Sequence, residues 1–217
     1  MSIEWPAHGL KLQARIEGGT ATIGVIGMGY VGLPLAVAFC EANCPVLAFD
    51  LDDAKIDALK AGESYIKHID GTRIAPQVEA KRLDATSDLD RLGEADVLLI
   101  CVPTPLSRHL EPDLKYVEAT TAAIAKTLRL GLLVVHESTT HPATTREVRQ
   151  PILEAGGLVA GVLAAAATGA STPARPAVVS ASSRYVPGIV LIDEPAAMLV
   201  NVPVPVSEPS LARIRAL

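Results

Sequence analysis

Several features that define common protein classes are scarce in this sequence. It has three cysteines, Cys40, Cys44 and Cys101, and no CxxC or Cys/His cluster at metal-ligand spacing. A small, odd number of cysteines argues against a disulfide framework and favours a reducing cytoplasm, and without a ligand cluster we expect no metal site. The formal net charge is −5, and no lysine or arginine run is present. Neither nucleic acid nor an anionic membrane surface is therefore expected as a partner.

Long hydrophobic runs are also absent. No stretch reaches the ~18 uninterrupted apolar residues that a membrane span needs, so we expect no membrane-spanning segment. Residues 1–20 contain charges and Pro6, but no apolar core of the length found in signal peptides. Of the 217 residues, 49% are hydrophobic, which is enough for one good core.

Short apolar runs alternate with segments of helical character. The sequence predicts strands at residues 22–26, 46–49, 82–86, 95–102 and 132–135. Helices are expected between them, near residues 33–39, 52–60, 74–81, 113–128 and 144–155, and a short one at 10–16. Continuous apolar strands are typical of a parallel sheet that is buried on both faces. The predicted fold class is therefore α/β, a Rossmann-type doubly wound parallel sheet.

A glycine motif follows the first predicted strand. Gly27, Gly29 and Gly32 form Gly-x-Gly-x-x-Gly and pass directly into a helical segment. Such a strand, turn and helix receive a dinucleotide pyrophosphate: the first glycine permits a tight turn, the second lets the diphosphate approach, and the third lets helix and strand pack closely. The first-turn amides and the helix dipole then face the phosphate. The alternative is a plain turn, because glycine triplets also occur there.

An acidic residue ends the second predicted strand. Asp50 lies eighteen residues beyond Gly32, where a carboxylate accepts hydrogen bonds from the adenosine ribose and repels a 2′-phosphate. This favours NAD over NADP. The alternative role for Asp50 is the N-cap of the helix at residues 52–60.

The last part of the chain has a different composition. Residues 158–217 contain no lysine, one aromatic residue, seven prolines and an alanine-rich stretch at 160–170. Apolar runs at 178–179, 188–192 and 197–200 are long enough for short strands, but prolines interrupt this region repeatedly. We therefore expect three parts: an N-terminal extension (1–19), an NAD-binding Rossmann domain (20–157) and a divergent, weakly specified tail (158–217).

Taken together, the motifs resemble the UDP-glucose/GDP-mannose dehydrogenase family, from about residue 20 to 157. The form Glu-Ser-Thr-Thr-x-Pro is most similar to the branch that oxidises UDP-N-acetylglucosamine or related sugars. The matching segments are Gly-Met-Gly-Tyr-Val-Gly-Leu-Pro-Leu at 27–35, Asp50, Val-Pro-Thr-Pro at 102–105, Glu-Pro-Asp-Leu at 111–114, and Glu-Ser-Thr-Thr at 137–140 with Pro142, Thr144 and Thr145.

The resemblance implies site residues. Thr139 resembles the threonine that orders a catalytic water near the nicotinamide, although it also suits an ordinary N-cap. Lys55 resembles a basic residue near the adenosine ribose, or is a solvated helix residue. His136 and His141 depart from the family and are interpreted as tolerated substitutions. The implied cofactor-binding residues are Gly27, Met28, Gly29, Tyr30, Val31, Gly32, Asp50, Lys55, Val102, Pro103, Thr104, Pro105 and Ser138.

The family's catalytic half has no counterpart in the sequence. The family oxidises a sugar C6 alcohol to a carboxylate in two NAD-dependent steps, through a cysteine thiolate and with a lysine beside the oxyanion. No Phe-Ser-Pro-Glu segment, lysine or cysteine follows Gly157. The three cysteines present are expected to be small core residues. The tail reflects either a frameshift near Gly161 or a genuine lineage-specific tail.

We therefore expect the NAD-binding domain of a nucleotide-sugar 6-dehydrogenase, truncated before its catalytic cysteine and lysine. Its substrate would be UDP-N-acetylglucosamine or UDP-glucose, its compartment the cytoplasm, and a homodimer is one assembly open to it. Two alternatives stay open. The chain is a non-catalytic NAD-binding module or inactive subunit partner, or it is a truncated product without function.

Overall fold

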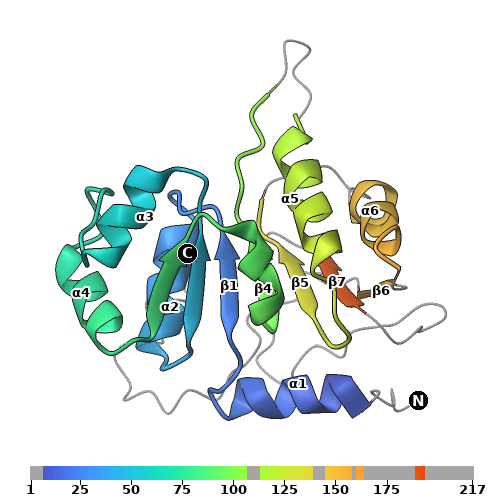
Figure 1. Cartoon of the computed structure of the whole chain (residues 1–217), viewed down its shortest axis with the longest axis horizontal. Coiled ribbons are helices and arrows are strands. Elements are labelled where there is room, and N and C mark those ends of the chain that lie inside the picture. The colour runs from blue at the N-terminus through green and yellow to red at the C-terminus, as the bar shows by residue number, and fades with distance from the viewer. Residues whose placement is uncertain (1–6, 107–112, 139–144, 158–159, 164–188, 194–217) are drawn as a thin grey trace, which may run out of the picture.

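The computed structural model describes residues 7–106, 113–138, 145–157, 160–163 and 189–193. Within these ranges the chain forms a parallel sheet of seven strands in the order β3-β2-β1-β4-β5-β7-β6 (Figure 1). The first strand, β1 (Ile23–Ile26), lies between β2 (Val46–Phe49) and β4 (Val97–Ile100). The strand order therefore reverses at β1. In open α/β sheets, ligands bind beyond the carboxyl ends of the strands at such a switch point.

The first half of the sheet follows the predicted strand and helix alternation. After β1 come α2 (Gly32–Glu41), β2, α3 (Asp53–Lys60), α4 (Gly71–Glu79) and β3 (Leu83–Thr86). All residues of β1 and β2 are buried, which is why their sequences read as continuous apolar runs. Figure 1 shows α3 and α4 beside the β2 and β3 half of the sheet.

The second half repeats the same logic on the other side of β1. Its strands β4 and β5 are fully buried, and α5 and α6 lie beside them (Figure 1). The elements are η1 (Leu89–Glu94), β4, α5 (Lys115–Lys126), β5 (Leu133–His136), η2 (Thr145–Arg149), α6 (Gln150–Glu154), β6 (Ala160–Leu163) and β7 (Ile189–Asp193).

The core is divided by the sheet into two apolar clusters. Along β4, Val97 and Leu99 belong to one cluster, whereas Leu98 and Ile100 belong to the other. Successive side chains of a strand point to opposite faces, so one strand contributes to both clusters. The apolar core therefore lies on both faces of the sheet.

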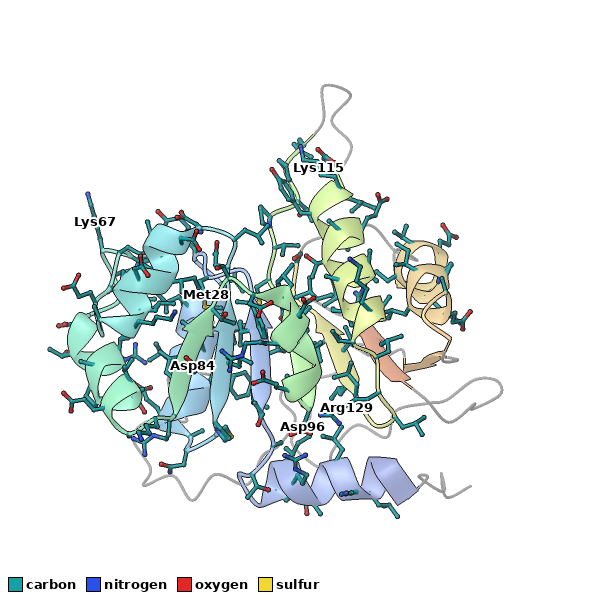
Figure 2. The ribbon with its side chains drawn as sticks, in the orientation of Figure 1. Met28, Lys67, Asp84, Asp96, Lys115 and Arg129 are labelled. Atoms are coloured by element: carbon teal, nitrogen blue, oxygen red, sulfur yellow. The ribbon has the colours of Figure 1, made fainter. Side chains whose placement is uncertain are left out.

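A short helix, α1 (Ala7–Glu17), lies along the amino ends of the strands (Figure 1). It is held by Asp96, whose side chain is only 3% exposed and pairs with Arg15 at 2.5 Å and Arg129 at 2.6 Å. The second carboxylate oxygen accepts a hydrogen bond from the Thr22 amide at 2.8 Å. Figure 2 shows Asp96 and Arg129 between the sheet and α1. The expected helix at residues 10–16 is confirmed, and it is longer at its start.

The doubly wound parallel sheet is confirmed, with local differences. The helix expected at 74–81 begins at Gly71, because Asp70 caps it with a hydrogen bond from the Thr72 amide. The helix expected at 144–155 opens with one wide turn, η2, before α6. Two strands come from the segment 158–217: β7 matches the apolar run at 188–192, whereas β6 begins the alanine-rich stretch. β7 lies between β5 and β6, an insertion in the sequential order.

Candidate cofactor-binding site

The three glycines of the motif occupy the turn between β1 and α2, and each has its own local requirement. Gly27 has φ +95°, and a Cβ there would lie 2.7 Å from the Cys101 carbonyl oxygen. A Cβ on Gly32 would overlap the carbonyl oxygen of Gly27. A Cβ on Gly29 would have no atom within 4 Å. The geometry therefore agrees with a turn at the first glycine, free space at the second and close packing at the third.

The loop amides are arranged for an anion. The amides of Gly29, Tyr30 and Val31 donate to no acceptor among the described residues, and α2 begins directly after them. Tyr30 is 77% exposed, so this side of the loop is open. Unpaired amides at the positive end of a helix bind phosphate well. The loop, here defined as residues 27–32, therefore combines open space at Gly29 with the amides that a phosphate site needs.

Asp50 is bonded to the loop and to a lysine. Its Oδ2 accepts hydrogen bonds from the Met28 amide at 2.8 Å and from Lys55 Nζ at 3.0 Å, and its Oδ1 accepts one from the Asp52 amide at 3.0 Å. A carboxylate has about four acceptor positions, so Asp50 retains one for a ribose hydroxyl. The N-cap of α3 is Asp52, which accepts from the Ala54 amide. The alternative role of Asp50 as that N-cap is therefore wrong.

The contacts of Lys55 and Met28 could not be read from the sequence. Lys55 is not simply a solvated helix residue, because its ammonium is paired with Asp50 and its side chain is 32% exposed. The Met28 side chain is fully buried, and its amide is used by Asp50. Met28 therefore supports the loop by packing in the core and by its hydrogen bond to Asp50. Direct contact of either residue with a cofactor stays a prediction.

The segments after β4 and β5 meet at the same carboxyl edge. Ser138 donates from Oγ to the Val102 carbonyl at 2.6 Å and lies 3.3 Å from the Ile100 carbonyl. Thr104 is partly buried, while Pro103 and Pro105 beside it are exposed. Ser138 thus fastens the residue 102–105 segment to the end of β5. Thr139 and His141 lie outside the described residues.

The cysteines are poorly suited to form thiolates. Burial raises the pKa of Cys40 and of Cys101 to about 12, and it also raises the pKa of Cys44. Cys101 lies directly after β4 rather than inside it, with its carbonyl against Gly27. A thiol with a raised pKa is a weak nucleophile at neutral pH. These groups agree with the expectation of small core residues.

His136 is buried at the end of β5 beside Arg149. Neither of its ring nitrogens has a hydrogen-bond partner among the described residues, and burial, with the charge of Arg149, lowers its pKa to about 3. A ring with so low a pKa is uncharged at neutral pH and accepts a proton only weakly, so it is a poor general base. This agrees with the interpretation as a tolerated substitution. Sequence reasoning missed the complete burial of Arg149, because an arginine on a helical segment ordinarily indicates an exposed face.

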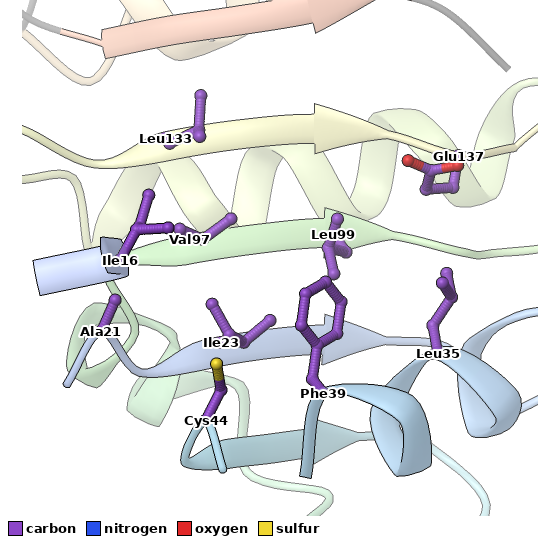
Figure 3. Close-up of a pocket in the computed structure, with 10 residues that line it drawn as sticks. All are labelled: Ile16, Ala21, Ile23, Leu35, Phe39, Cys44, Val97, Leu99, Leu133 and Glu137. Atoms are coloured by element: carbon purple, nitrogen blue, oxygen red, sulfur yellow. The ribbon is translucent and has the colours of Figure 1, made fainter. Parts of the chain in front are cut away.

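A separate apolar pocket lies on the face of the sheet near α1 and α2. Figure 3 shows side chains of α1, α2, β1, β4 and β5 converging there. Its described lining includes neither the 27–32 loop nor Asp50, so it is distinct from the candidate cofactor site. Burial raises the pKa of Glu137 at its edge. The lining residues are Ile16, Ala21, Ile23, Leu35, Phe39, Cys44, Val97, Leu99, Leu133 and Glu137.

The described residues were also compared with the requirements of a metal site and of a membrane span, and they meet neither. Within the described ranges, no group of three or more histidine, cysteine or acidic side chains comes together as a metal site would require. In the same ranges, no helix combines the length and apolar character needed to cross a bilayer. The 27–32 loop with Asp50 is therefore the candidate site that the geometry supports.

Comparison with known proteins identifies the family. The profile of the UDP-glucose/GDP-mannose dehydrogenase family, NAD binding domain, matches residues 21–169. The chain belongs to this family. The fold class and the NAD cofactor expected from the sequence are thereby confirmed, and the family is one of NAD-dependent oxidoreductases. The match also extends beyond residue 157, where the motif resemblance ends.

Individual relatives agree and show how much of them the chain covers. UDP-N-acetyl-D-glucosamine 6-dehydrogenase of Pseudomonas aeruginosa is 36% identical over 61% of this chain and 30% of its own length. UDP-N-acetyl-D-mannosamine dehydrogenase of Escherichia coli is 38% identical over 62% of this chain and 31% of its own. The chain spans about a third of the length of these relatives.

Solved structures give the same result. GDP-mannose dehydrogenase from Pseudomonas aeruginosa, crystallised as a ternary complex, has a TM-score of 0.62 at 30% identity and covers 64% of this chain and 33% of that one. NDP-N-acetyl-D-galactosaminuronic acid dehydrogenase from Methanosarcina mazei has a TM-score of 0.61 at 35% identity, covering 70% and 35%. The family's dinucleotide-binding architecture is thus preserved in the described part of the chain.

Proposed function

We propose that this chain is the NAD-binding part of a nucleotide-sugar 6-dehydrogenase, with UDP-N-acetylglucosamine or UDP-glucose as the substrate class. The observation that supports this most directly is the 27–32 loop. The loop has open space at Gly29, amides that meet no acceptor among the described residues, and the adjoining Asp50, all near the switch point of the sheet. The Pseudomonas relative that is named for UDP-N-acetyl-D-glucosamine supports the choice of substrate.

In this proposal, each part of the site binds one part of the cofactor. The amides of residues 29–31 hold the diphosphate, and Asp50 accepts from the adenosine ribose while Lys55 balances its charge. Bound NAD supplies the hydride acceptor for an alcohol oxidation. Thr104 and Ser138 border the nicotinamide end, where Thr139 would order a water. Val102, Pro103 and Pro105 keep this border rigid.

The two-step oxidation that the family resemblance implies uses a cysteine thiolate as nucleophile. The sequence has no cysteine after Cys101 and no lysine after Lys126. Burial raises the pKa of Cys101 to about 12, so it does not supply a thiolate at neutral pH. A second candidate function, for these 217 residues taken alone, is that of an NAD-binding module without dehydrogenase activity or an inactive partner in an oligomer.

The proposal also includes the domain organisation and the compartment. We take residues 20–157 as the cofactor domain, 1–19 as an extension and 158–217 as a divergent tail, and we propose that the protein is located in the cytoplasm. A homodimer is part of the proposal as well. Light scattering coupled to size-exclusion chromatography measures the mass directly, and a monomer at all concentrations contradicts the dimer.

The experiment combines binding with turnover. The purified chain is titrated with NAD by calorimetry and then mixed with NAD and either UDP-sugar, while NADH absorbance is followed. We expect NAD binding without sustained NADH formation. Absence of NAD binding contradicts the proposal. Formation of two NADH per sugar contradicts the non-catalytic alternative and identifies an unrecognised nucleophile, which Cys101→Ser would test.

A further inference from the structure

A segment far from the glycine motif in sequence packs against the 27–32 loop. This segment, residues 64–69, joins α3 to α4 and is anchored by Ile66 and Ile69, whose side chains are 6% and 4% exposed in the core. Ser64 stabilises it locally, because its hydroxyl contacts both the carbonyl (3.1 Å) and the amide (3.2 Å) of Ile66. Core packing and these hydrogen bonds therefore fix the position of the segment.

The first contact is a hydrogen bond from Tyr65. Its hydroxyl donates to the Met28 carbonyl oxygen at 2.7 Å. The same residue, Met28, donates its amide to Asp50 at 2.8 Å. Burial and the nearby carboxylates of Asp50 and Asp52 raise the Tyr65 pKa, so the hydroxyl stays a donor at neutral pH. The backbone of Met28 is thus held on both sides, immediately before Gly29.

The second contact is a ring stack. The rings of Tyr30 and His68 are nearly parallel, with an angle of 15° and centroids 5.8 Å apart. Tyr30 belongs to the loop and His68 to the 64–69 segment. Figure 2 shows Lys67 of the segment pointing into solvent while Met28 lies at the end of the strands. The segment therefore touches the loop on each side of Gly29.

We propose that Tyr65 is a positioning residue for diphosphate recognition, acting through the Met28 carbonyl. This inference rests on the proposed function, because it concerns the same NAD site. The amides of residues 29–31 bind a diphosphate well only if the loop already holds their N–H groups pointing towards the same ligand position. Binding sites gain affinity when supporting hydrogen bonds fix the groups that contact the ligand. The 64–69 segment provides this support from outside the glycine motif.

The test is Tyr65→Phe, which removes only the hydroxyl. Its matched control is Tyr116→Phe, because Tyr116 is exposed on α5. We expect Tyr65→Phe to weaken both NAD and ADP about five- to tenfold, the loss typical of one hydrogen bond. Adenosine, which has no phosphate, should bind as it does to the unchanged protein. The control should bind all three ligands normally.

A second variant, His68→Ala, removes the ring stack and should weaken ADP by a smaller factor without affecting adenosine. Thermal unfolding without ligand is measured for every variant, since a purely structural role lowers the melting temperature but does not discriminate between ADP and adenosine. Normal ADP affinity in Tyr65→Phe, or equal losses for ADP and adenosine, overturns the inference. If the unchanged protein binds NAD poorly, the proposed function itself is wrong.

Discussion

Gly29 offers the sharpest test of the cofactor site, because the structure separates its role from that of its neighbours. A Cβ at this position meets no atom within 4 Å, and its φ is not in the left-handed region. We therefore expect Gly29→Val to fold, with a change in the free energy of unfolding below about 1 kcal/mol, as for surface substitutions. The valine side chain would occupy the space of the diphosphate.

The effect on binding should be large. Excluding the diphosphate from the amides of residues 29–31 should reduce NAD affinity at least a hundredfold, which is about 2.8 kcal/mol. Gly32→Ala is the matched control for folding. Its Cβ would overlap the Gly27 carbonyl, so we expect a loss of about 1–3 kcal/mol in unfolding free energy, typical of overpacking.

Two measurements decide between these outcomes. Urea unfolding without ligand reports the stability of both variants, and calorimetric titration with NAD reports affinity. The expected pattern is a stable Gly29→Val that does not bind and a destabilised Gly32→Ala. Native NAD affinity in Gly29→Val would refute the assignment of the diphosphate position. An unfolded Gly29→Val would refute the claim that this space is free.

Three further predictions concern polar side chains that are buried or paired. Asp50→Ala should weaken NAD by about 1–3 kcal/mol, and calorimetry should show a smaller loss for NADP. His136→Leu should raise the free energy of unfolding by about 1–3 kcal/mol, because it removes a buried ring whose nitrogens find no partner within hydrogen-bond geometry among the described residues. With the folded pKa lowered to about 3, the protein should lose stability as pH falls from about 6.5 towards 3, and urea unfolding should show a weaker pH dependence in His136→Leu. Asp96→Ala should cost about 2–4 kcal/mol, less than for a fully enclosed pair because both arginines are over a third exposed, as urea unfolding would measure.

The sequence predicted those parts of the fold whose cause is local. A strand buried on both faces needs apolar residues at every position, so β1, β2, β4 and β5 are visible as short apolar runs. The glycine motif was equally readable, because a positive φ and a close approach leave few other residues possible. Both signals depend on neighbours within a few residues.

Features that depend on distant partners were not predicted. Nothing near Tyr65 in the sequence indicates that its hydroxyl reaches Met28, thirty-seven residues away. The complete burial of Arg149 likewise depends on how η2 packs against the second half of the sheet. β7 pairs with β5 on one side and β6 on the other. The apolar run at 188–192 predicts a strand but does not indicate which strands it pairs with. Tertiary contacts, not local pattern, decide these positions.

The ion pair between Asp50 and Lys55 gives a physical account of cofactor choice. Lys55 Nζ lies 3.0 Å from Asp50 Oδ2, so its charge is engaged at the ribose acid rather than free for an added phosphate. A 2′-phosphate would face the carboxylate of Asp50, which the Met28 amide holds in place on the loop side. Like charges at short distance in a partly buried site repel strongly, whereas a ribose hydroxyl needs only one remaining acceptor position. In the proposed site, we therefore expect a preference for NAD from the same hydrogen bonds that shape the loop, and we expect that a change in cofactor choice requires changes in the loop as well as at Asp50.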